Sequence, residues 1–313
     1  MRVVLAGATG AIGRSLVPQL LAAGHGVVGL TRSEKGAAQL RAAGADAVHA
    51  DILDEEALLS SLTGHSADAV VHQATAIDGV PMRHRDLYAT DALRDEGTRN
   101  LLRAAEVVGA YRFVTQSFFL GYGYRDHGDG LLTEKHAFAE PTGHRGFDRH
   151  MDSMRNNERH VLESDGVDGV ALRYGMFYGP EPATRRLATL AARRALPMPF
   201  PSGITSLVNI HDAASAAVAA LDRGNGGQAY NIVDDHPVGF ADYVAAIADR
   251  AEAPAPMTVP GWLLKPLPYM YALMVATRIR LSNAKAKREL GWAPRYPSYR
   301  DGLDALRLDR GEQ

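Results

Sequence analysis

The feature that most constrains this fold is a glycine-rich turn near the start of the chain. An apolar run at residues 2–6 leads directly into GATGAIG at residues 7–13, and an amphipathic pattern over 12–23 follows. Glycine permits a tight turn and close approach of a ligand to the backbone, while a helix N-terminus offers free N–H groups and positive potential. A strand, a glycine turn and a helix in this order predict a pyrophosphate-binding site for a dinucleotide.

Short apolar runs alternate with amphipathic segments through the first two-thirds of the chain. The expected strands are residues 2–6, 27–31, 47–50, 69–72, 112–115 and 170–173, and the expected helices between and after them are 12–23, 34–43, 55–62, 86–108 and 148–164. This alternation predicts an α/β fold, a doubly wound parallel sheet of the Rossmann type. After residue 173, prolines interrupt this alternation of strands and helices. We expect a dinucleotide-binding domain at 1–173, with strands returning from about 205–235, and a smaller C-terminal substrate lobe at 174–313.

Composition excludes several classes of function. Cysteine is absent, which rules out disulfides, thiol catalysis and cysteine-ligated metal, and the net charge of −2 gives no electrostatic reason to expect nucleic acid or an anionic membrane as partner. The histidines lack a ligand spacing on one helix, so no metal site is expected. Met1 runs straight into a strand without a leader pattern, and the apolar stretch 262–275 is interrupted and too short to span a bilayer. We expect a cytoplasmic protein.

The end of the second predicted strand bears on the choice of cofactor. NAD-specific proteins usually place an acid there to bond the ribose 2′-hydroxyl, whereas an arginine accommodates a 2′-phosphate. This chain has Arg32 and Ser33 at that point, with Lys35 close behind. The pattern favours NADP(H), with NAD(H) possible; the alternative is that Arg32 is only a solvated surface charge.

Several further segments follow in a characteristic order. They are Asp51-Ile52, His72-Gln73-Ala74-Thr75-Ala76, GTRNLL at 97–102, VTQS at 114–117 with GYG at 121–123, LRYGMFYGP at 172–180, VNIHD at 208–212 and LGWAP at 290–294. Together they resemble the extended short-chain dehydrogenase/reductase family, the NAD-dependent epimerase/dehydratases. The resemblance covers nearly the whole chain. It implies a homodimer, paired through helices like those at 86–108 and 148–164.

The resemblance also assigns roles to individual residues. It implies cofactor contacts at Gly7, Thr9, Gly10, Ala11, Ile12, Gly13, Arg32, Ser33, Asp51, Ile52, Gln73, Ala74, Thr75 and Tyr174. Ser117 matches the strand that carries the catalytic serine, whose hydroxyl polarises a substrate carbonyl. The alternative for Ser117 is a hydroxyl that caps the local backbone.

The chain departs from the family at the catalytic helix. Members carry Tyr-x-x-x-Lys there, with the tyrosine moving a proton and the lysine lowering its pKa. Aligning Glu158 with the family's later glutamate places His150 at the tyrosine position and Met154 at the lysine position. Three interpretations follow: His150 replaces the tyrosine, a tyrosine elsewhere moves the proton (122, 124, 174 or 178), or hydride chemistry has been lost. Alternatively, His150 is an ordinary half-exposed helix residue.

These observations predict an NADP(H)-dependent oxidoreductase acting on a carbonyl or hydroxyl of a small metabolite. Ser117, His150 and Tyr178 are the candidate catalytic residues. Two alternatives remain at this point: a redox-neutral lyase, isomerase or epimerase on the same scaffold, and a non-enzymatic NADP(H)-binding sensor.

Overall fold

Seven parallel strands form the centre of the molecule, in the order β11-β6-β5-β4-β1-β2-β3. The computed structural model describes residues 1–77, 79 and 81–306. The strands are β1 (Arg2–Ala6), β2 (Gly26–Thr31), β3 (Asp46–His49), β4 (Ala69–His72), β5 (Arg112–Phe118), β6 (Asp168–Tyr174) and β11 (Gln228–Ile232). The predicted doubly wound sheet is confirmed.

The sheet is buried on both faces, which explains the continuous apolar runs of its strands. Val3 and Leu5 of β1 pack into one apolar cluster, while Val4 and Ala6 pack into a second cluster on the opposite face. The first face is covered by α1 (Ala11–Ala22), α2 (Glu34–Ala42) and α8 (Ile210–Arg223), and the second by α3 (Glu55–Leu62), α5 (Thr98–Val108) and α6 (Arg145–Leu162). Strand order reverses between β1 and β4, so the ligand-binding crevice of such a sheet opens at their carboxyl ends.

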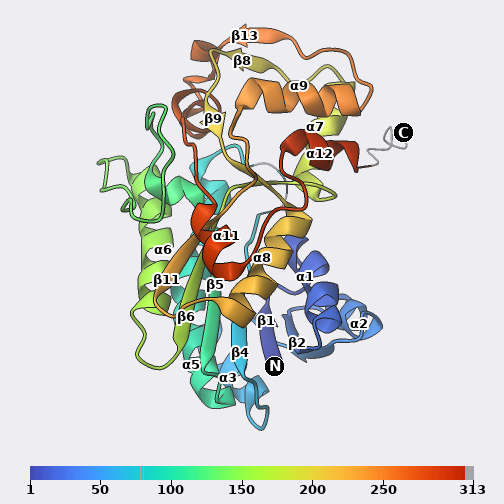
Figure 1. Cartoon of the computed structure of the whole chain (residues 1–313), viewed down its shortest axis with the longest axis vertical. Helices are drawn as coiled ribbons and strands as arrows, with labels where there is room; N and C mark the ends of the chain where they lie inside the picture. Colours follow the sequence, from blue (N-terminus) through green and yellow to red (C-terminus); the bar gives the residue numbers. More distant parts are fainter. Residues whose placement is uncertain (78, 80, 307–313) are drawn as a thin grey trace.

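A smaller lobe lies at the opposite end of the molecule from the N-terminus (Figure 1). Its elements are β7 (Met176–Tyr178), α7 (Pro182–Ala192), β8 (Met198–Phe200), β9 (Ile204–Thr205), β10 (Leu207–Asn209), β12 (Val238–Gly239), α9 (Phe240–Arg250), β13 (Thr258–Pro260), η4 (Gly261–Leu264), α10 (Pro268–Tyr271), η5 (Ala272–Ala276) and α12 (Tyr299–Asp304). The helix α11 (Ala284–Leu290) instead packs against α8 and β11 on the first face of the main sheet. Three two-stranded ribbons, β7–β10, β9–β12 and β8–β13, brace the lobe. The chain returns from it through α8 and β11 to the main sheet.

The segment predicted as one helix over 86–108 is interrupted. It begins with the 3₁₀ turn η1 (His84–Leu87) and short helix α4 (Tyr88–Ala92), passes through the π-helical segment η2 (Leu93–Gly97), and continues as α5. The Leu93 carbonyl lies 3.1 Å from Nε2 of His72, at the end of β4. Apolar periodicity cannot reveal this widened turn, because the π segment changes the backbone hydrogen-bond pattern and not the order of apolar residues in the sequence. Such turns are common at functional sites.

The apolar stretch 262–275 is interrupted, as its prolines and lysine predict. It consists of η4, α10 and the π-helical η5, with Trp262 and Leu263 exposed and Tyr269 and Met270 buried. Proline at position 268 begins α10 and breaks the preceding turn. Within the part of the chain that the structure describes, no helix is long and apolar enough to cross a membrane.

Candidate active site

The glycine turn between β1 and α1 is closed tightly against the segment that follows β4. Gly7 has φ +84°, and a Cβ added there would lie 2.6 Å from the backbone nitrogen of Ala74. A Cβ at Gly13 would lie 2.2 Å from the Gly7 carbonyl oxygen. Gly10 precedes α1 as its N-cap and supplies no side-chain hydrogen bond, so no side chain of the cap takes up the first N–H groups of the helix. This cradle, which side chains would fill, fits the pyrophosphate of a dinucleotide.

The residues assigned to the adenosine end meet at the carboxyl ends of β2 and β3. Nη1 of Arg32 lies 3.8 Å from Oδ2 of Asp51, and the Arg32 side chain is 71% exposed. Ser33 caps α2, with its hydroxyl accepting from the Gly36 N–H at 3.1 Å. Ile52 is buried beneath them, and its carbonyl accepts from the Asn100 amide at 2.9 Å. An exposed pair such as Arg32–Asp51 is weak, so Arg32 can turn to an anionic ligand at little cost.

The residues after β4 lie at the other end of the crevice. Gln73 is buried, and neither polar atom of its side chain has a hydrogen-bond partner among the described residues. Thr75 is exposed and Ala74 is half-buried beside it. Tyr174 is fully buried at the end of β6, where burial raises the pKa of its hydroxyl, and it donates to the Ala213 carbonyl at 3.4 Å. The Gln73 amide also lies against the Tyr174 hydroxyl, which partly opposes the effect of burial on the pKa of Tyr174, and the Gln73 backbone packs against Gly7 of the glycine turn.

His150 lies on α6 and has both ring nitrogens engaged. Its Nδ1 is 2.7 Å from Oδ2 of Asp91 on α4, and its Nε2 is 3.0 Å from Nδ1 of His84 on η1. The ring is only 1% exposed, so it is not the half-exposed surface residue that the sequence left open. The second oxygen of Asp91 accepts from the Ser153 hydroxyl at 3.0 Å. Asp91, His150 and His84 therefore form one hydrogen-bonded series, which we call the Asp–His–His series.

His84 ends this series inside an aromatic cluster. Its ring stacks on His150 and meets the edges of Phe147 and Tyr269, with ring centroids 4.5 and 5.6 Å away. The Nε2 atom is buried and has no hydrogen-bond partner among the residues described. Burial, assisted by the nearby His150 and His144, lowers the pKa of His84 to about 4, so the ring is neutral at pH 7. Nothing in the spacing of the sequence connected His84 or Asp91 with His150.

Met154 and Ser117 lie on either side of the contact between α6 and β5. Met154 is part of an apolar cluster and supplies no cation in place of the family's lysine. Ser117 is two residues after Thr115, whose hydroxyl bonds Asn157 of α6 at 2.7 Å, so the two hydroxyls share the α6 face of the sheet. The Ser117 hydroxyl is fully buried and has no partner within the described part of the chain.

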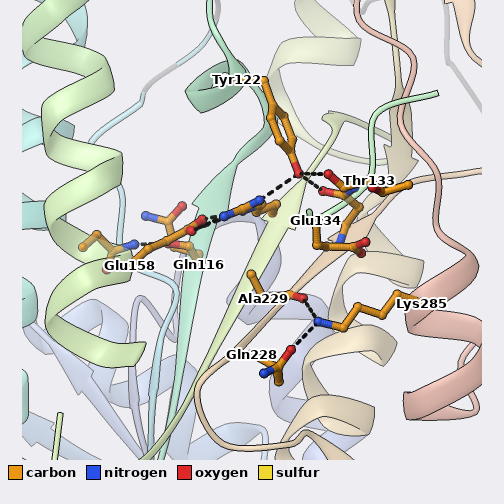
Figure 2. Close-up of polar contacts among 11 residues, drawn as sticks. Gln116, Tyr122, Thr133, Glu134, Glu158, Gln228, Ala229 and Lys285 are labelled. Atoms are coloured by element: carbon orange, nitrogen blue, oxygen red, sulfur yellow. Dashed lines mark hydrogen bonds and ion pairs between the residues drawn. The ribbon is translucent and has the colours of Figure 1, made fainter. Parts of the chain in front are cut away.

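Tyr122 is held in a structural network. It donates to Asn231 at 2.9 Å and accepts from the Arg173 guanidinium at 2.8 Å, and burial raises its pKa to about 12. Figure 2 shows its hydroxyl above Glu134, with Glu158 of α6 on the other side of the network. Glu158 holds Arg173 through a buried pair at 2.7 Å. The glutamate that anchored the alignment thus ties α6 to β6.

Tyr178 lies in the core of the smaller lobe. Its hydroxyl donates to the Ser298 carbonyl at 3.1 Å, and a Cβ added at Gly302 would lie 2.3 Å from the Tyr178 hydroxyl oxygen. It clusters with Tyr243 and Tyr299 of α9 and α12. Ser117 and His150 both contribute to the region around α6, whereas Tyr178 has its recorded contacts elsewhere.

A doubly wound sheet with a glycine cradle at its switch point defines a dinucleotide-binding α/β protein. This chain belongs to the NAD dependent epimerase/dehydratase family, whose model matches residues 3–233. Members of this family are nicotinamide-dependent enzymes, and the resemblance drawn from the motifs is confirmed.

Two curated relatives match almost the whole chain. A 3-diazoavenalumate denitrifying reductase from Streptomyces sp. is 36% identical over 310 residues, which cover 97% of this chain and 99% of that protein. A 4-hydroxy-2-methyl-3-oxo-4-farnesyl-3,4-dihydroquinoline-1-oxide ketoreductase from Stigmatella aurantiaca is 26% identical over 332 residues, covering 98% and 96%. These relatives support an oxidoreductase of the reductase type.

Solved structures share the fold at low identity. UDP-glucose 4-epimerase from Thermotoga maritima, with UDP-glucose, superposes with a TM-score of 0.79 at 19% identity, covering 99% of this chain and 98% of that one. The Thermus thermophilus UDP-glucose 4-epimerase complex with NAD gives 0.77 at 22% identity and the same coverage.

Proposed function

We propose that this protein is an NADP(H)-dependent reductase of a small electrophilic metabolite, in which the Asp–His–His series replaces the family's tyrosine and lysine. The observation that carries this proposal is the hydrogen-bonded contact of His150, at the tyrosine position, with Asp91 at 2.7 Å and His84 at 3.0 Å. A carboxylate, two imidazoles and an unpartnered terminal nitrogen are an arrangement that can hold and deliver one proton.

Arg32 supports the choice of NADP(H). It is exposed, its ion pair within residues 1–77, 79 and 81–306 is the weak contact with Asp51, and it follows β2 where a ribose 2′-substituent is expected. The cradle residues Gly7, Thr9, Gly10, Ala11, Ile12 and Gly13 would hold the pyrophosphate, and Ser33, Asp51 and Ile52 would flank the adenosine. Gln73, Ala74 and Thr75 would line the ribose and diphosphate, and Tyr174 would lie on the nicotinamide side.

The proton path follows from the tautomers of the two rings. The Asp91 carboxylate fixes a proton on Nδ1 of His150, so an added proton occupies Nε2 of His150 and is donated to Nδ1 of His84. His84 then carries its own proton on Nε2, the atom that faces away from His150. When that proton leaves for the substrate, Nδ1 takes the next one from His150. His84 remains uncharged throughout, in agreement with its lowered pKa.

When bound, the reduced nicotinamide supplies a hydride to an electrophilic group of the substrate. A carbonyl reduced in this way also takes up one proton, which the Asp–His–His series provides, and the Ser117 hydroxyl is the group available to polarise its oxygen. The denitrifying relative suggests a second electrophile. A diazonium group exchanged for hydrogen releases dinitrogen and takes up no proton, so the series would be dispensable for that substrate.

Tyr178 has no part in this proposal, because its hydroxyl is bound in the lobe core. The resemblance to the family supports a homodimer through α5 and α6, which light scattering after size-exclusion chromatography tests. A cytoplasmic location agrees with the absence of cysteine from the sequence.

The test begins with titration of the purified protein with NADPH and NADH, followed by loss of nicotinamide absorbance against ketones, aldehydes and arenediazonium salts. We expect tighter binding of NADPH and turnover on at least one electrophile. Tight NADPH binding without turnover on any of them would instead favour the sensor or a redox-neutral reaction.

A further inference from the structure

Arg94 is a buried charged residue that the proposed chemistry does not use. It lies in the π-helical segment η2, and the residue is only 5% exposed. Across residues 1–77, 79 and 81–306, no carboxylate lies within ion-pair distance of it, and its Nε atom has no hydrogen-bond partner. The nearby Asp91 already bonds His150 and Ser153. Arg94 is therefore a buried cation whose charge is poorly matched.

Keeping the charged guanidinium of Arg94 buried costs free energy. Desolvating an ion costs several kcal/mol, about what a well-placed ion pair returns, and an unmatched charge loses that return. Burial lowers the pKa of Arg94, although the charge of Asp91 partly opposes the shift. The cost is recovered when an anion enters and bonds the guanidinium, most effectively with both oxygens of a carboxylate.

The surroundings of Arg94 are aromatic. Its Cζ lies 5.8 Å from the centre of the Phe118 ring at the end of β5, and Tyr124 and Tyr269 lie close enough to act on its charge. Tyr269 also meets His84 and His150, with ring centroids 5.6 and 6.2 Å away. Arg94 thus borders the same aromatic cluster that contains the end of the Asp–His–His series.

The backbone at Arg94 is also unusual. Arg94 lies in a π turn, which adds one residue to a turn of the helix. Such turns are rare and are frequently found at functional sites. A second π segment, η5, directly follows the helix that carries Tyr269. Both irregular segments adjoin the aromatic cluster.

We propose that Arg94 binds the carboxylate of an aromatic or conjugated acid, whose ring packs against Phe118, Tyr124 and Tyr269. This inference names the substrate class of the proposed reductase and rests on that function for its catalytic meaning. The binding itself does not depend on turnover, so the two can fail separately.

The test compares trans-cinnamate with trans-cinnamamide, which have the same ring and chain but differ in charge. Isothermal titration calorimetry of the wild-type protein, with and without NADP⁺, is expected to give at least about tenfold tighter binding of the acid, the equivalent of one charged hydrogen bond. Arg94→Gln should abolish this preference, and Arg94→Lys should retain part of it. Arg99→Gln, an exposed arginine one turn further along the same helix, should leave it unchanged.

Equal affinity of the wild-type protein for the acid and the amide would overturn the proposal, and this comparison decides even if Arg94→Gln does not fold. An undiminished preference in a folded Arg94→Gln variant would overturn it as well. A preference for the acid without reduction of any electrophile would leave the carboxylate site standing and reject the reductase.

Discussion

Nε2 of His150 lies 3.0 Å from Nδ1 of His84, a residue 66 positions earlier in the chain. The motif alignment predicts that His150 stands at the place of the family's proton-carrying tyrosine, yet its other nitrogen is held by Asp91 at 2.7 Å and its ring is buried. In the function proposed above, His84 is therefore the residue of the series that would donate to a substrate, and His150 would act through it. This relationship changes which residue should be tested as the proton donor.

Replacing His84 by glutamine should separate the proton path from cofactor binding. Glutamine keeps polar atoms near His150 but cannot accept a proton at one atom while releasing another. For a ketone substrate we expect kcat to fall about 10²- to 10⁴-fold, with the Kd for NADPH unchanged. Stopped-flow absorbance and a fluorescence titration measure the two quantities.

The neighbouring His144 supplies the control, because its ring lies 5.2 Å from that of His84 but outside the Asp–His–His series. His144→Gln should retain ketone reduction. Full activity in His84→Gln combined with loss in His150→Phe would show that His150 donates directly. Reduction of an arenediazonium salt should be insensitive to all three changes, since it needs no proton.

Arg32→Ala should weaken the binding of NADPH much more than that of NADH. One charged hydrogen bond to the 2′-phosphate is worth about 1.5–3 kcal/mol, so the Kd for NADPH should rise about 10- to 100-fold. Arg41→Ala removes a charge from the last turn of the same helix region and serves as the control. Equal weakening of both cofactors by Arg32→Ala would contradict a role in choosing the phosphate.

Gly13→Ala should disrupt the cradle. Its Cβ would lie 2.2 Å from the Gly7 carbonyl oxygen, so the turn must open to admit one methyl group. We expect a loss of about 1–3 kcal/mol in the free energy of unfolding and at least tenfold weaker NADPH binding. Gly130→Ala, where an added Cβ meets nothing within 4 Å, should change neither. Thermal unfolding and calorimetry provide the measurements, and wild-type affinity in Gly13→Ala would argue against the cradle.

Asp234 should make the protein less stable as the pH rises. Burial raises its pKa from 3.8 to about 8, and Oδ2 has no hydrogen-bond partner among the described residues. The folded state thus binds this proton more tightly than the unfolded chain, and the stabilisation is lost between about pH 4 and pH 8. Asp234→Asn should be more stable than the wild type at pH 8 by about 1–3 kcal/mol, and urea unfolding from pH 5 to 8.5 would measure it.

The adjacent Asp235 gives the opposite expectation. Burial alone would raise its pKa, but the bonds from Lys287 and Asn283 outweigh burial and lower it. Asp235→Asn should therefore destabilise the protein at neutral pH. If Asp234→Asn also destabilises the protein at neutral pH, the charge of Asp234 is compensated in the fold and the expected pH dependence is wrong.

Local sequence signals were sufficient for much of the nucleotide-binding half. The run Arg2–Ala6 with the glycines at 7, 10 and 13 predicted β1, the turn and α1, because strand, tight turn and helix each depend on neighbours a few residues apart. The helix that contains Arg94 could be predicted only in part. The apolar periodicity of residues 86–108 indicated a helix, but the π turn at Arg94 leaves no trace in that periodicity.

By itself, the sequence determined the fold class and family, together with the glycine turn between β1 and α1, and it predicted that His150 and Met154 stand where the family has tyrosine and lysine. Only the tertiary structure decided which residues lie against His150. Asp91 and His84 lie 59 and 66 positions from His150. They come together because β4 and β5 are adjacent in the sheet, and η1 and α4, which follow β4, pack against α6, which follows β5. Hydrogen bonds between residues so distant in the chain depend on how whole elements pack, which no local pattern encodes.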